Sequence, residues 1–330
     1  MRRISSQKPP SPDRTLRSPW MQRHAPWLYA FWKFSRPHTI IGTSLSVLGL
    51  YAIALSQQGL ELEGMTAFLP EVMGTLLACL CGNVYIVGLN QLEDVSIDRI
   101  NKPHLPLASG EFSRREALLI VGILGMAALL LSFWQGRFLF GMVGLSLLIG
   151  TAYSLPPIRL KRFPLLASLC IFTVRGVIVN LGLFLHFNQR LSPAEPDRWL
   201  QIPASVWALT LFVLVFTFAI AIFKDIPDLE GDRRYNINTF TLQLGAPAVF
   251  NLARWVLTIC YVGMIVAGFF LASVHLGVLI LTHAVALVAL WIRSRQVDLK
   301  EKRSIARYYQ FIWKLFFLEY IMFPIACLLA

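Results

Sequence analysis

A chain of 330 residues in which 56% are hydrophobic and only 15% are charged is not an ordinary soluble protein, because soluble domains carry about a quarter charged residues. The composition indicates a multi-pass membrane protein that is surrounded by the lipid bilayer. The formal net charge of +12 does not indicate nucleic-acid binding, because the basic residues stand in short blocks between apolar runs. No nucleic-acid partner is therefore expected.

The first segment, residues 1–27, is rich in Arg, Pro and Ser and contains no apolar stretch of signal-peptide length. Because such a composition buries little apolar surface, it predicts a disordered basic N-terminal tail. Residues 28–330 are predicted to form a single transmembrane domain, and nothing in them indicates an obligate protein partner.

Nine apolar runs follow the tail, each close to the length of about 20 residues that a helix needs to cross a bilayer. They predict an all-α fold in which about nine transmembrane helices form one bundle around a central cavity. The predicted spans are at about 38–56, 67–90, 114–134, 137–153, 164–187, 202–224, 255–273, 274–292 and 309–329.

The distribution of basic residues predicts the orientation of this bundle. If the amino terminus is cytoplasmic, 24 of the 30 Lys and Arg residues fall on the inner side of the membrane. Only Arg137, Arg190 and Arg198 fall in the opposite loops. This excess follows the positive-inside rule, so the ends of the second and sixth spans face the cytoplasm.

An acidic motif closes the second apolar run. On a helix that advances about 100° per residue, Asn90, Asp94 and Asp98 fall within about 80° of one another, and they predict one polar ridge. At the edge of a membrane the alternative is a set of solvated loop ends, but the regular spacing argues against it.

A second acidic cluster closes the sixth run, and it places Asp225, Asp228 and Asp232 on one helical face. Sliding the chain on itself by 134 residues puts Asp94 on Asp228 and Asp98 on Asp232. This correspondence, four spans apart and in the same orientation, suggests a degenerate parallel duplication.

Two facing carboxylate ridges present hard oxygen ligands of the kind that suit Mg2+, which is usually completed by substrate phosphates. Nearby Lys and Arg residues can bind the remaining phosphate oxygens. A diphosphate that is reached from inside a membrane belongs most naturally to an isoprenoid. Metal-assisted departure of diphosphate then leaves an allylic cation for a nucleophile to capture.

Four basic residues on the inner side, Lys102, Arg159, Lys161 and Lys224, are candidate diphosphate partners, although solvated positive-inside charges need no further function. Tyr153, at the end of the fourth span, is a candidate either for stabilising the cation with its ring or for orienting a phenol with its hydroxyl. A tyrosine of the interfacial aromatic belt is the alternative.

The pattern Asn-Gln-x-x-Asp-x-x-x-Asp from Asn90 to Asp98, paired with Asp228 and Asp232 on nine apolar spans, resembles the UbiA-type intramembrane aromatic prenyltransferases. Gln91 stands where many members have Asp, which is similar to the homogentisate phytyltransferase branch and leaves one carboxylate fewer for metal. The segments that resemble this cyanobacterial and plastid branch are Phe34–Thr39, Gly88–Gln91, Ile97–Pro103, Leu105–Gly110, Thr151–Ser154, Lys224–Asp228 and Tyr309–Phe317.

The resemblance covers roughly residues 30–325 and implies two Mg2+ ions that clamp phytyl diphosphate. It implies transfer of the phytyl group to homogentisate with loss of carbon dioxide, giving 2-methyl-6-phytylbenzoquinol, a tocopherol precursor. The implied metal ligands are Asp94 and Asp98 for one ion, Asp228 and Asp232 for the other, and Asn90 and Asp225 as assisting groups.

Three questions stay open at this point. The donor could be a geranylgeranyl or solanesyl diphosphate, and the acceptor could be a chlorophyllide. A transporter is the alternative of another class, although transporters tend to bind near the midplane and not at one face. The resemblance places the protein in the thylakoid or plasma membrane of a cyanobacterial-type cell, or in a plastid membrane.

Charged residues inside the spans are expensive and usually face the bundle interior. Arg175, near mid-depth of the fifth span, either holds the homogentisate carboxylate or ties helices together through an Asn such as Asn180. Lys314 and Glu319 lie about 140° apart on the last span, so each is expected to meet another helix.

Overall fold

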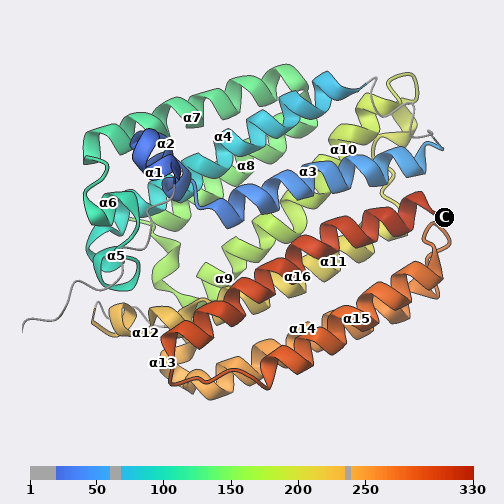
Figure 1. The fold of residues 1–330 in the computed structure, drawn as a ribbon. Coiled ribbons are helices and arrows are strands. Elements are labelled where there is room, and N and C mark those ends of the chain that lie inside the picture. Colours follow the sequence, from blue (N-terminus) through green and yellow to red (C-terminus); the bar gives the residue numbers. More distant parts are fainter. Residues whose placement is uncertain (1–19, 60–67, 235–238) are drawn as a thin grey trace, which may run out of the picture.

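A computed structural model describes residues 20–59, 68–234 and 239–330. Within these ranges every regular element is helical, and nine helical segments are long and apolar enough to cross a membrane, as predicted. The chain is therefore an integral, multi-pass membrane protein. Its spanning helices (Figure 1) are α3 (Pro37–Gln57), α4 (Leu69–Glu93), α7 (Arg114–Gln135), α8 (Arg137–Ser154), the continuous α9 (Pro164–Phe172), η3 (Thr173–Ile178) and α10 (Val179–Leu191), α11 (Ala204–Phe223), α14 (Ala246–Gly268), α15 (Leu276–Ser294) and α16 (Lys302–Leu328).

Close packing between α4 and α7 shows how these apolar helices associate. A Cβ atom added at Gly125 of α7 would come within 2.5 Å of the Tyr85 ring of α4, and one at Gly88 of α4 would come within 2.7 Å of Val121 of α7. Between lipid-embedded helices, small residues permit this close approach and the van der Waals contact that stabilises it. The outer face of α7 carries exposed large apolar side chains instead: Leu118, Leu119, Ile123, Met126, Leu130 and Phe133.

Four short helices gather at one end of the bundle (Figure 1). They are α5 (Val95–Asn101), α6 (Pro106–Ser109), α12 (Asp225–Arg234) and α13 (Phe240–Leu244). Helix α5 packs directly against α12, so the two acidic motifs, which are 134 residues apart in the sequence, face each other at this end.

The order of elements agrees with the predicted duplication. A long helix, two short helices and another long helix occur first as α4, α5, α6 and α7 and then as α11, α12, α13 and α14. Helices α11, α13 and α14 begin 132–135 residues after α4, α6 and α7, respectively.

The tail and the starts of two spans differ from the sequence prediction. Residues 1–19 of the predicted tail lie outside the described residues, but α1 (Trp20–His24) and the start of α2 (Pro26–Phe34) show that the rest of this segment is helical except at Ala25. The seventh span begins at Ala246 and not near 255. It includes Arg254, whose guanidinium carbon lies 4.5 Å from the Trp291 ring of α15, a cation–π contact. The ninth span begins at Lys302 and not near 309.

A buried polar pair joins the last two spans. The Nε2 atom of His283 on α15 lies 3.2 Å from the Oε2 atom of Glu319 on α16, and both side chains are fully buried. The two groups are close but are not aligned as a hydrogen bond. The prediction that Glu319 meets another helix is confirmed.

Candidate functional site

One cavity of about 1270 Å³ runs from the polar end of the bundle into its interior. It is lined by eleven of the twelve predicted site residues; the side chain of the twelfth, Asp232, is outside the described part of the structure. Apolar side chains of the spanning helices form much of the inner wall, so a ligand with a charged head and an apolar tail matches its two ends. The apolar lining includes Val47, Cys79, Met142, Val143, Leu147 and Leu183.

The first motif does not lie on one continuous helix, and this corrects the predicted ridge. Helix α4 ends at Glu93, and Asp94 stands between α4 and α5 with φ −111° and ψ 18°. Asp94 and Asp98 nevertheless both line the cavity. The backbone leaves the helical path where the Asp94 carboxylate is bound by cations from a distant loop, a contact that helical spacing cannot include.

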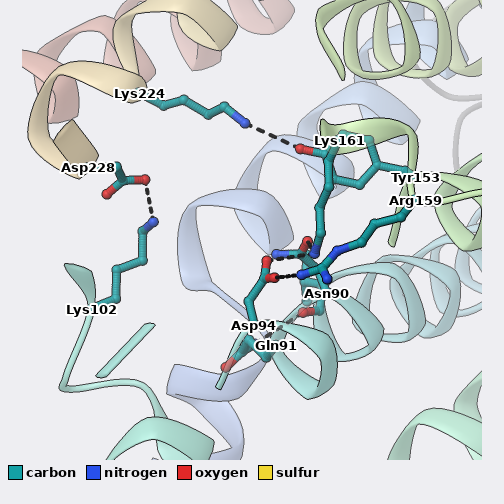
Figure 2. A network of polar contacts seen from close by, with 10 residues as sticks. Asn90, Gln91, Asp94, Lys102, Tyr153, Arg159, Lys161, Lys224 and Asp228 are labelled. Carbon is teal, nitrogen blue, oxygen red and sulfur yellow. Dashed lines mark hydrogen bonds and ion pairs between the residues drawn. The ribbon is translucent and has the colours of Figure 1, made fainter. Parts of the chain in front are cut away.

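Two cations hold the Asp94 carboxylate (Figure 2). Arg159 donates from Nη2 to Oδ1 over 3.1 Å, and Lys161 donates from Nζ to Oδ2 over 2.7 Å. Lys161 also donates to the Asn90 Oδ1 atom over 3.1 Å. These cations come from the segment around η2 (Leu160–Arg162), and burial lowers the pKa of Lys161.

Backbone strain accompanies this contact. Arg159 has φ +40°, and Arg36, another cation that lines the cavity, has φ +54°. For a residue with a side chain, the left-handed region costs about 1–2 kcal/mol. Such conformations persist where surrounding contacts hold them, which is common at functional sites. Both cations are thus held toward the cavity at a cost in stability.

Asp98 is the most deeply buried carboxylate of the first motif. It is only 5% exposed, and its Oδ2 atom has no hydrogen-bond partner among the described residues. Burial raises the pKa of this carboxyl group to about 6. A buried oxygen that lacks a donor is a position that a metal cation can satisfy.

The second motif reaches the first through an ion pair (Figure 2). The Lys102 Nζ atom, just after α5, lies 2.5 Å from the Asp228 Oδ2 atom of α12. Between α11 and α12, the Lys224 Nζ atom donates to the Tyr153 hydroxyl over 3.3 Å. Asp225 lines the same cavity. The structure therefore brings the two motifs and their candidate cations to one place.

Cations outnumber anions on the cavity wall. Among the described side chains, eight Lys and Arg residues line it against five Asp and Glu residues. This excess, in a site shielded from bulk water, favours an anionic ligand. No three described His, Cys, Asp or Glu residues cluster as a metal site by themselves. Mg2+ needs only one or two carboxylates when substrate phosphates complete its shell, so the donor set fits a metal that binds together with a diphosphate.

Gln91 does not line the cavity. Its Nε2 atom donates to the backbone oxygen of Phe34 over 2.7 Å, and the side chain is almost fully buried. The inference that Gln91 removes a carboxylate from the metal site is therefore wrong, since this position does not line the cavity. Its role is to join α4 to the end of α2.

The second alternative for Arg175, that it ties helices together through Asn180, is also wrong. Asn180 donates to the backbone oxygen of Gly176 over 2.9 Å and accepts a hydrogen bond from the Tyr320 hydroxyl over 2.6 Å. Arg175 instead lines the cavity.

Sequence reasoning missed part of the cavity wall. Arg36 and His38, at the start of α3, and Tyr309 and Trp313, on α16, all line the cavity. They belong to the segments Phe34–Thr39 and Tyr309–Phe317, which carry the family resemblance, but nothing in their spacing distinguishes them from interfacial residues. For Arg36 and His38, the available signal was their position on either side of Pro37, directly before an apolar run.

Comparison with known proteins gives consistent matches. The sequence profile of the UbiA prenyltransferase family matches residues 44–315. The chain is 54% identical to the homogentisate phytyltransferase of Synechocystis, over 91% of this chain and 96% of that protein. It is 38% identical to homogentisate phytyltransferase 1 of Arabidopsis thaliana (90% of this chain, 75% of that one) and 40% identical to homogentisate solanesyltransferase of the same plant (93% and 78%).

Solved structures share the fold at low sequence identity. A UbiA homolog from Archaeoglobus fulgidus bound to GPP and Mg2+ matches with a TM-score of 0.60 and 18% identity, over 91% of this chain and 100% of that one. A digeranylgeranylglyceryl phosphate synthase matches with a TM-score of 0.61 and 18% identity, over 92% and 99%. These matches agree with the helical membrane bundle described above.

Proposed function

The chain belongs to the UbiA prenyltransferase family, and on this basis we propose that it transfers a phytyl group from phytyl diphosphate to homogentisate. The carboxylate of the acid leaves as carbon dioxide, and the product is 2-methyl-6-phytylbenzoquinol. The protein is a membrane enzyme, and its similarity to a Synechocystis relative supports placement in a thylakoid or plasma membrane.

The observation that carries this proposal is the two-part cavity. Its mouth combines Asp94, Asp98, Asp225 and Asp228 with excess cations, and apolar side chains form much of its inner wall. A diphosphate fits the mouth, and an isoprenoid chain fits the interior, where burial of its apolar surface is favourable. The active site thereby encloses the bond that breaks and limits access of water to the reactive allylic group.

We assign the metal-binding role to the carboxylates of the two motifs. Asp94, Asp98 and Asp228 are the described candidates for Mg2+, with Asn90 and Asp225 assisting, and Asp232 completes the set proposed from sequence. When bound, Mg2+ supplies Lewis-acid stabilisation of the departing diphosphate. The solved Archaeoglobus homolog that is bound to GPP and Mg2+ supports this assignment.

The cations that hold the motif carboxylates have a second role in the proposal. Each of three cations forms an ion pair with a motif carboxylate: Lys102 with Asp228, and Arg159 and Lys161 with Asp94. They therefore lie within reach of a diphosphate held between the motifs. They and Lys224 bind its oxygens through charge-assisted hydrogen bonds. Tyr153, held by Lys224, turns its ring toward the allylic group and stabilises positive charge there.

The donor is assigned as phytyl diphosphate because the chain is 54% identical to the Synechocystis phytyltransferase. The plant relatives at 38–40% include phytyl, solanesyl and geranylgeranyl transferases, so they do not discriminate between donors. The test is one reaction of purified protein in lipid nanodiscs, with Mg2+, homogentisate and equal amounts of phytyl, geranylgeranyl and solanesyl diphosphates. Mass spectrometry identifies the products, and we expect the phytyl product to dominate.

The same experiment carries arms for the alternatives. Dominant geranylgeranyl or solanesyl product would overturn the donor assignment, and product from added chlorophyllide in preference to homogentisate would overturn the acceptor assignment. Movement of substrate across a sealed vesicle membrane without any chemical conversion would favour a transporter and refute the enzyme proposal.

A further inference from the structure

Arg175 is a cation within the membrane-spanning part of the bundle that pairs with no acidic group among the described residues. It lies in the π-helical segment η3, between α9 and α10. Its guanidinium carbon is 5.4 Å from the ring of Trp313 and 5.4 Å from the ring of Phe316, both on α16. No carboxylate that the structure describes forms an ion pair with it. An unpaired charge at this depth is costly and marks a functional position.

The surroundings of Arg175 leave its polar edge open to the cavity, whose wall it forms. A Cβ atom at Gly42 of α3 would come within 3.0 Å of the Arg175 Nη1 atom, so the missing side chain at position 42 gives the guanidinium its space. Asn180 is occupied by Gly176 and Tyr320. The aromatic rings hold the cation by cation–π attraction but satisfy none of its in-plane donors.

Arg254 shows what a structural arginine in the same bundle looks like. It also contacts two rings, with its guanidinium carbon 5.8 Å from Phe250 and 4.5 Å from Trp291. However, it donates a hydrogen bond over 2.9 Å to the Asn251 side chain, and it does not line the cavity. The difference between the two arginines is the open cavity in front of Arg175.

Charges in the cavity are separated in a way that gives the acceptor an orientation. The carboxylates of the two motifs lie at the mouth, whereas Arg175 lies beside Trp313, whose ring is 4.8 Å from that of His38. Once a diphosphate occupies the cations at the mouth, its charge repels a negatively charged acceptor, whereas Arg175 attracts it. The aromatic ring of the acceptor can then lie near His38 and Trp313, between the Arg175 guanidinium group and the diphosphate.

We propose that Arg175 binds the carboxylate of the aromatic acceptor and thereby selects aromatic acids over phenols that lack this group. The inference rests on the proposed function, because it needs an aromatic acid as the acceptor. The planar guanidinium can donate two parallel hydrogen bonds to a carboxylate, which a lysine cannot reproduce. A site built to bind a charged group in this way discriminates strongly against ligands without it.

The experiment measures equilibrium binding by calorimetry in nanodiscs, without Mg2+, for two ligands. Homogentisate carries the carboxylate, and methylhydroquinone has the same dihydroxy ring with a methyl group in place of the carboxymethyl group. The variants are Arg175→Met, Arg175→Lys and the control Arg254→Met. We expect Arg175→Met to weaken homogentisate binding by at least about tenfold and to leave methylhydroquinone binding unchanged. Arg175→Lys should be intermediate, and Arg254→Met should match the wild type for both ligands.

Steady-state kinetics separate a binding role from a structural one. In Arg175→Met the KM for homogentisate should rise by a similar factor, while the KM for the prenyl diphosphate stays within about threefold. Equal affinity of the wild type and Arg175→Met for homogentisate would overturn the inference. If Arg175→Met does not fold, Arg175→Lys decides: an unchanged ratio of the two ligand affinities overturns the inference, and a lower preference for homogentisate supports it. Failure of the wild type to bind or convert homogentisate refutes the proposed function itself.

Discussion

Replacing Asp228 by Asn tests the metal assignment with the smallest change in shape. The variant keeps the size of the side chain and an oxygen that accepts a hydrogen bond from Lys102, whose Nζ atom lies 2.5 Å away. Only the negative charge is lost. Metal stabilisation of a departing phosphate supplies several kcal/mol, and about 4 kcal/mol corresponds to a loss of about a thousandfold in kcat/KM.

The same structure predicts a small effect of this variant on stability. Side-chain exposure is 15% for Asp228 and 33% for Lys102, so solvent screens the pair and its net contribution to folding is about 1 kcal/mol or less. The midpoint of thermal unfolding in detergent should fall by no more than about 2 °C. Loss of activity without loss of stability is the expected signature.

The assay is diphosphate release by purified protein over a Mg2+ titration, with both substrates present. Asp197→Asn is the matched control, because Asp197 is an exposed carboxylate in η4 (Pro196–Arg198), outside the cavity. It should behave as the wild type. An Asp228→Asn enzyme with more than about a tenth of wild-type kcat/KM at saturating Mg2+, a loss of less than about 1.4 kcal/mol, would refute the metal assignment.

Three further substitutions test other parts of the structure. Tyr153→Phe should keep most of kcat if the ring stabilises the cation, whereas Tyr153→Leu should lose on the order of a hundredfold; equal rates would contradict that role. Gly125→Ala, which meets a tyrosine ring at 2.5 Å, should lower stability by about 1–3 kcal/mol, while Gly122→Ala, which has open space, should not; thermal unfolding in detergent compares them. His283→Ala should lower the free energy of unfolding by about 3–5 kcal/mol, because it leaves the buried Glu319 carboxylate unpaired. The double variant with Glu319→Leu should recover much of this loss in the same assay. No recovery would mean that the two side chains do not interact.

Much of the architecture follows from the sequence alone, because it depends on local composition. Apolar runs long enough to cross a bilayer have to form helices, since no water is present to satisfy their backbone groups. The positions of Lys and Arg then place the ends of the second and sixth spans on one side. From these two facts the sequence determines that the acidic motifs share one membrane face. It also identifies the family, through the spacing of Asn90, Asp94 and Asp98 and the second set of aspartates.

Contacts between distant segments were decided only by the tertiary structure. The break at Asp94, the turn of Gln91 toward Phe34 and the pairing of His283 with Glu319 each depend on what another helix presents at that point. Helical periodicity assigns a residue to a face but does not say which neighbour covers that face. For the same reason, only the assembled bundle shows that Arg175 meets aromatic rings and an open cavity instead of a carboxylate.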